Sequence, residues 1–189
     1  FKIAKVHNWQ LKSKKYYLIV SRLNKWKKIE IAIRAAIELN KNLIIVGDGD
    51  VVPQLKADVK EMGIEDQVLF FGKRPYLELM NFTALSDLGI SMDKDSNINY
   101  RFSLPNKIFD YIHAGIPLMV SNLTEIKKIV LDYQVGVICD SHEPDQIAQS
   151  INDLFANSEK MEMFRTNTIN AAKELNWAKE TEVLKEIYL

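Results

Sequence analysis

Short apolar runs alternate with amphipathic stretches along most of the chain, and this alternation restricts its fold more than any other feature. The runs are rich in β-branched and aromatic side chains and lie at 16–20, 43–46, 68–71, 88–90, 118–120 and 135–138. Continuous apolar runs of this length are typical of strands buried on both faces, as in a parallel sheet.

Helical periodicity fills the segments between these runs. Apolar residues recur at spacings of three and four around 29–37, 55–62, 77–85, 108–114, 124–133 and 145–155. Gly63 and Gly115 stand just past two of these stripes, where helices commonly end. The segment from Ser158 to Leu189 predicts one or two further helices. The alternation predicts an α/β domain: a doubly wound, parallel, six-stranded Rossmann-like sheet with helices on both faces.

Composition removes several classes of function. Lys plus Arg and Asp plus Glu number 25 each, so the net charge is zero and bulk charge gives no reason to expect nucleic-acid binding. The one cysteine, Cys139, cannot form an internal disulfide, and no apolar run is long enough to span a bilayer. No metal-ligand spacing occurs, so we expect no metal and no cofactor.

A basic cluster follows the first run, at the expected entrance of a helix. In open α/β sheets ligands bind beyond the carboxyl ends of the strands, so residues at these positions are candidate ligands. Cations are unfavourable at a helix N-terminus, and the cluster therefore predicts a bound anion. Arg22 suits phosphate oxygens and Lys27 can act as a point charge. A solvated basic turn is the simpler alternative.

Glycine follows the second and third runs, in Gly47-Asp48-Gly49 and in Gly72-Lys73. Glycine frees the backbone to approach a ligand, and exposed backbone groups at Gly72 could bind the edge of a flat heterocycle. Plain turns explain both segments equally well. The G-x-G-x-x-G dinucleotide motif is absent after the first run, which disfavours an NAD-dependent dehydrogenase.

A polar loop, Met92–Ser103, follows the fourth run and leads into another helix. The helix start at Pro105–Lys107 offers free backbone N–H groups and one cation to a phosphate. Asp110, in the next turn, could accept hydrogen bonds from paired sugar hydroxyls. The residues predicted to form the loop around a donor are Gly47, Asp48, Asn99, Arg101, Leu104, Pro105 and Asn106.

These segments resemble the C-terminal, nucleotide-sugar-binding domain of GT-B fold glycosyltransferases, in particular the retaining family 4 (group 1), which includes capsule, O-antigen and lipopolysaccharide transferases. The likeness rests on Ser-Arg-Leu with a lysine five residues after the arginine, Ile-Ile-Val-Gly-Asp-Gly, Val-Leu-Phe-Phe-Gly-Lys, and the Leu-Pro-Asn-Lys segment that continues to Gly-Ile-Pro. It runs from about Tyr16 to the C-terminus.

The resemblance implies a role for each matching residue. Arg22 and Lys27 match the basic pair that holds the donor diphosphate, and Lys107 matches a second anchor near the phosphates. Gly72 and Lys73 lie where the family contacts the base. Asp110 stands where the family has a glutamate that binds the ribose hydroxyls.

Two positions depart from the family pattern. Phe102 stands where the family has a second glutamate, eight residues before the ribose carboxylate, and Asn99 or Arg101 could substitute for that glutamate at the donor sugar. Ser21 and Lys28 replace two glycines beside the phosphate site.

The resemblance also implies a missing half, because GT-B enzymes have two Rossmann-like domains with the chemistry between them. We therefore expect residues 1–15 to be a linker and edge, 16–176 the donor-binding domain, and 177–189 a helix returning toward an N-terminal domain. The implied reaction moves a sugar from a nucleoside diphosphate sugar to a saccharide or lipid-linked acceptor, with retention.

Several further expectations accompany this assignment. The fragment alone should bind nucleotide weakly and be inactive. The parent protein should be cytoplasmic, and a peripheral site at the inner face of the membrane is compatible with this. The alternatives are a GT-B-like sugar-nucleotide epimerase and a non-catalytic binding module.

Overall fold

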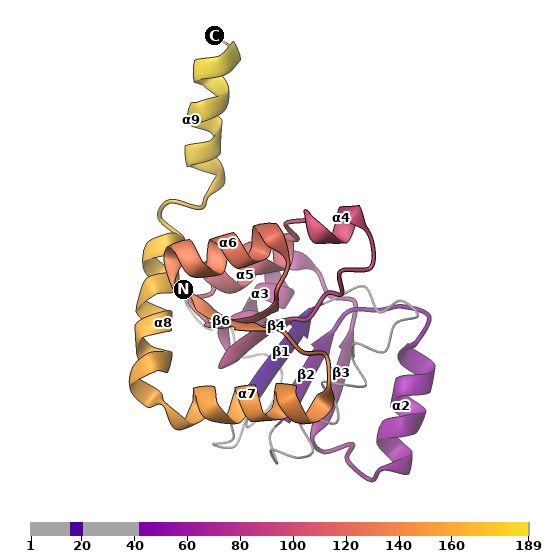
Figure 1. The fold of residues 1–189 in the computed structure, drawn as a ribbon. Helices are drawn as coiled ribbons and strands as arrows, with labels where there is room; N and C mark the ends of the chain where they lie inside the picture. The colour runs from indigo at the N-terminus through magenta and orange to yellow at the C-terminus, as the bar shows by residue number, and fades with distance from the viewer. Residues whose placement is uncertain (1–15, 21–41, 189) are drawn as a thin grey trace.

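A parallel six-stranded sheet forms the centre of the domain (Figure 1). The computed structural model describes residues 16–20 and 42–188. The strands are β1 (Tyr16–Val20), β2 (Asn42–Val46), β3 (Val68–Gly72), β4 (Leu88–Ser91), β5 (Leu118–Ser121) and β6 (Gly136–Cys139). Their order is β3-β2-β1-β4-β5-β6, which is that of the Rossmann fold. The predicted doubly wound α/β fold class is therefore confirmed.

The helices follow the predicted apolar stripes closely. They are α2 (Val52–Glu61), α3 (Tyr76–Ala84), α4 (Ile98–Arg101), α5 (Asn106–His113), α6 (Thr124–Tyr133), α7 (Pro144–Ala156), α8 (Ser158–Ala171) and α9 (Trp177–Tyr188). The segment that predicted one or two terminal helices contains two, α8 and α9. The stripe at 29–37 lies outside the described residues.

Helix α4 corrects the expectation that Met92–Ser103 is an irregular loop. It begins after Asn97, whose side-chain oxygen accepts a hydrogen bond from the backbone N–H of Tyr100 at 3.0 Å. Asparagine is a favoured N-cap residue because it satisfies a free N–H of the first turn. One turn of helix is too short to show a periodic stripe, which is why the pattern missed it.

Both faces of the sheet are covered, as the continuous apolar runs predicted. All five side chains of β2 are buried, and the four apolar ones alternate between two clusters. Leu43 and Ile45 lie in the cluster with apolar side chains of α2, α7 and α8. Ile44 and Val46 lie in the other, with side chains of α3, α5 and α6. The apolar core therefore extends over both faces of the sheet.

Helix α5 lies unusually close to β4. A Cβ added to Gly89 would overlap the ring of Tyr111, so only glycine allows this approach. The Tyr111 side chain is fully buried, and its hydroxyl donates a hydrogen bond to the backbone oxygen of Ile90 at 3.2 Å. This packing holds the second half of α5 against β4.

Helix α9 extends away from the sheet and its covering helices (Figure 1). None of its residues is buried, and Trp177, Ile187 and Tyr188 are each more than two-thirds exposed. The sequence analysis placed a separate helical segment here, and the helix is present. Its predicted return toward an N-terminal domain stays a prediction.

Candidate functional site

The strand order reverses between β1 and β4, which are neighbours in the sheet. From β1 the chain moves to β2 on one side, and from β4 it moves to β5 on the other. Rossmann-like proteins bind their ligands in the crevice at the carboxyl ends of the strands at such a point. Arg22 and Lys27 follow β1 directly in sequence, but both lie outside the described residues.

An ion pair lies where the chain leaves β4. The Nζ atom of Lys107, in the first turn of α5, is 2.9 Å from Oδ2 of Asp93, and the two side chains are only 14% and 16% exposed. The hydroxyl of Ser91 donates to the same oxygen at 3.2 Å. Lys107 was predicted as a phosphate ligand from the sequence, whereas Asp93 was not among the predicted residues. The available signal was an acid two residues after a strand end.

Asp110 lies one turn further along α5 and is half-buried. The hydroxyl of Tyr76, the first residue of α3, donates a hydrogen bond to its Oδ1 at 2.9 Å. Burial raises the pKa of Asp110, while the bond from Tyr76 and the proximity of His113 act in the opposite direction. Burial and the neighbouring carboxylate also raise the pKa of the Tyr76 phenol. Tyr76 was not among the predicted residues.

The two glycine turns meet at the ends of β2 and β3. The backbone N–H of Gly47 donates to the carbonyl oxygen of Gly72 at 3.0 Å. Gly72 has a φ of 65°, in the left-handed region that glycine adopts without strain. Lys73 and Asp48 are both exposed, and Asp48 accepts a hydrogen bond from the N–H of Gly49. The two turns therefore lie side by side at one edge of the sheet, a contact that the sequence analysis did not predict.

The remaining predicted residues flank the start of α5. Leu104 and Asn106 are exposed, Pro105 precedes the helix, and no described side chain caps its first turn, so the first N–H groups remain available to an anion. In α4, Asn99 is exposed, and the Nε atom of Arg101 donates to both carboxylate oxygens of Asp95 at 2.9 and 3.1 Å.

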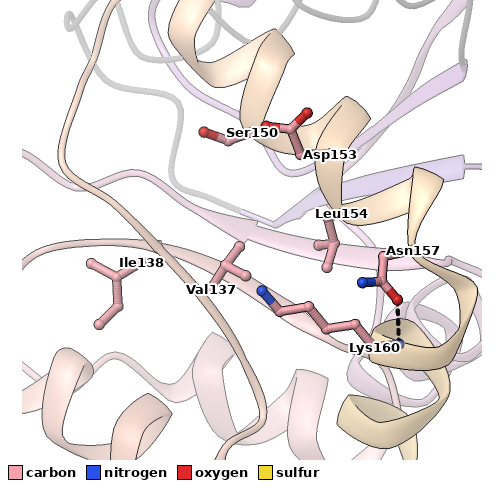
Figure 2. A pocket seen from close by; sticks show the side chains of 7 residues that line it. All are labelled: Val137, Ile138, Ser150, Asp153, Leu154, Asn157 and Lys160. Carbon is pink, nitrogen blue, oxygen red and sulfur yellow. Dashed lines mark hydrogen bonds between the residues drawn. The ribbon is translucent and has the colours of Figure 1, made fainter.

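A cavity of about 380 Å³ lies elsewhere, beside the edge strand β6 and the end of α7 (Figure 2). Its lining residues are Val137, Ile138, Ser150, Asp153, Leu154, Asn157 and Lys160. None of them is a predicted site residue. Within residues 16–20 and 42–188 there is no group of His, Cys, Asp or Glu arranged to hold a metal ion. No helix of the same ranges is long and apolar enough to cross a membrane.

The chain matches the family model described as "Glycosyl transferases group 1" over residues 2–171. It belongs to the group 1 glycosyltransferases. An uncharacterized glycosyltransferase of Methanocaldococcus jannaschii is 25% identical over 186 residues, which cover 95% of this chain and 46% of that protein. D-inositol 3-phosphate glycosyltransferase of Thermobispora bispora is 24% identical over 90% of this chain and 42% of that protein.

Solved structures confirm that this group 1 glycosyltransferase chain has the fold of one Rossmann-like half of a GT-B glycosyltransferase. Anabaena Alr3699/HepE, crystallised in complex with UDP, has a TM-score of 0.77 at 19% identity, covering 92% of this chain and 48% of that one. Sucrose-phosphate synthase of Thermosynechococcus elongatus has a TM-score of 0.78 at 17% identity, covering 93% and 45%. The chain spans about half the length of the proteins it matches.

Proposed function

We propose that this chain is the donor-binding domain of a glycosyltransferase whose parent protein moves a sugar from a nucleoside diphosphate sugar to a saccharide or lipid-linked acceptor, with retention. The observation that carries the proposal is the placement of Lys107 and Asp110 on one helix that begins beside the sheet's switch point. This helix offers a cation and free N–H groups to phosphates, and a carboxylate to sugar hydroxyls one turn away.

The proposed chemistry is electrostatic. When the bond between the sugar and the diphosphate breaks, negative charge develops on the leaving nucleoside diphosphate. Lys107 and the first turn of α5, with Arg22 and Lys27 after β1, would stabilise this charge without moving. Asp93 holds the Lys107 ammonium in place beforehand.

Base and ribose would bind next to each other. The partly buried backbone at Gly72 would meet the base, with the exposed Lys73 beside it, and Asp110 would accept hydrogen bonds from the ribose hydroxyls. Asn99, Arg101, Leu104 and the residues Gly47 and Asp48 would surround the donor. The structural neighbour from Anabaena was also crystallised with UDP-glucose, and this supports a nucleotide-sugar ligand for the fold.

Phe102 favours one alternative, a binding module without activity. Its side chain is 52% exposed next to the start of α5, where the family resemblance implies a glutamate that binds the donor sugar. A phenyl ring offers no hydrogen bond to a sugar hydroxyl. A module of this kind would bind the nucleotide, and the attached sugar would add no affinity.

Calorimetry with UDP, GDP and the corresponding nucleotide sugars tests both the transferase proposal and the inactive-module alternative. We expect a nucleoside diphosphate to bind more tightly than the monophosphate, and an Arg22→Ala variant to lose this preference. The absence of binding by every nucleotide at millimolar concentration would contradict the proposal. The transferase predicts that a nucleoside diphosphate sugar binds at least as tightly as the diphosphate, whereas weaker binding of every sugar would favour the inactive module.

A further inference from the structure

The hydrogen bond from Tyr76 to Asp110 joins two segments that are 34 residues apart. Tyr76 is 60% exposed as a whole, so water could satisfy its hydroxyl without this partner. Asp110 is half-buried, and the bond from Tyr76 is a contact that can orient its carboxylate. Satisfying the Tyr76 hydroxyl therefore does not by itself account for this hydrogen bond.

The hydrogen bond from Tyr76 occupies only one of the two carboxylate oxygens of Asp110. Tyr76 donates to Oδ1 of Asp110, and no described residue donates to Oδ2. An ionised carboxylate has two oxygens that each accept hydrogen bonds, and a charge-assisted bond to one of them fixes its plane. Asp110 thus has one anchored oxygen and one that remains able to accept.

Tyr76 also follows closely after the turn that ends β3. Between them, the Nε atom of Arg74 donates to the carbonyl oxygen of Phe71 at 2.9 Å, and Pro75 precedes α3. These two features limit the freedom of the turn that carries Gly72 and Lys73. Because α3 packs against α5, the tyrosine hydroxyl links this turn to the carboxylate.

We propose that Tyr76 is a positioning residue for the nucleotide: it holds Oδ1 of Asp110, so that Oδ2 is oriented to accept from the ribose hydroxyls. The inference rests on the proposed function. Asp110 has a shorter side chain than glutamate, and an anchored orientation compensates for part of that shorter reach.

A Tyr76→Phe variant removes only the hydroxyl. Calorimetry would compare UDP or GDP, whichever binds the unmodified chain more tightly, with its 2′,3′-dideoxy analogue. We expect Tyr76→Phe to weaken binding of the nucleotide about tenfold, the effect of one charge-assisted hydrogen bond. Binding of the dideoxy analogue should not change, because it lacks the hydroxyls that Asp110 accepts from.

The matched control is Tyr133→Phe, which removes another phenol whose pKa is raised by burial and by a nearby carboxylate, that of Glu174. It should leave both affinities unchanged. In an Asp110→Asn background, Tyr76→Phe should add no further loss. Equal weakening of nucleotide and analogue, or no weakening of either, would overturn the role of Tyr76. If the unmodified chain binds no nucleotide, the proposed function itself fails.

Discussion

Lys107 and Asp93 form a largely buried ion pair, with 2.9 Å between Nζ and Oδ2, at the point where the chain leaves the central strand β4. A second pair, Arg101 with Asp95, lies in the same segment but is about half exposed. The two pairs therefore differ mainly in burial. This difference lets the cost of breaking each pair be compared within one segment.

Asp93→Asn should lower the free energy of unfolding by about 2 kcal/mol, because it leaves a poorly hydrated ammonium without its counter-charge. Asp95→Asn, the matched control, should cost no more than about 0.5 kcal/mol, since exposed pairs contribute little. Urea denaturation of the two variants measures both values. Equal costs would show that the Asp93 pair is no more important than a surface contact.

Gly72→Ala should cost about 1–2 kcal/mol of stability, because an alanine is strained at positive φ. Gly63 is the control: its φ of 67° matches the 65° of Gly72, and at both positions an added Cβ would have no described neighbour within 4 Å. We expect similar stability losses in the two alanine variants, measured by thermal unfolding.

Nucleotide binding should separate these two glycines. Gly72→Ala is expected to weaken nucleotide binding, since a methyl group would stand where the base approaches. Gly63→Ala should leave binding unchanged because Gly63 follows α2 and is not part of the proposed site. A Gly72→Ala variant with full affinity would contradict the assignment of this turn to the base.

The affinity for nucleotide should depend on the ionisation of Asp110. Burial raises the pKa of Asp110, and ribose hydroxyls donate to the ionised form, so binding should weaken as the pH falls, beginning above the range of an ordinary aspartate. Phosphate protonation also weakens binding, and Asp110→Asn serves as the reference because it keeps only that contribution. A constant ratio of the two affinities from neutral to acidic pH would argue against Asp110 as a ribose ligand.

The pH dependence of folding stability that Asp110 contributes has the opposite sign to that of nucleotide binding. Because burial raises the folded-state pKa of Asp110, its contribution favours the folded state at low pH and is lost as the pH rises through that pKa. Compared with Asp110→Asn, the unmodified chain should therefore gain relative stability toward acidic pH in the absence of nucleotide. Chemical denaturation at two pH values measures this difference.

Local patterns were enough to predict the sheet and most helices. The run at 43–46 is buried on both faces in β2, and the stripe at 124–133 coincides with α6. Both elements are specified by residues close together in sequence. Helix α4, by contrast, has four residues and depends on one capping side chain, Asn97, so no periodic signal marks it.

The side chains that contact Lys107 and Asp110 could be identified only from the folded structure. Lys107 and Asp110 could be singled out because they lie in the first two turns of a predicted helix. Their partners, Asp93 and Tyr76, come from other segments, and α5 approaches β4 through the close packing of Tyr111 on Gly89. No pattern within one segment contains that information.

The most direct test of the proposed site is a nucleotide titration followed by backbone amide chemical shifts of the whole chain. With UDP or GDP, we expect the largest changes at Gly72, Lys107 and Asp110, at the carboxyl ends of the strands. Amides around the cavity beside β6, at Asp153 and Asn157, should stay unchanged. Changes centred on that cavity, with none in the first turns of α5, would contradict the assignment of the donor site.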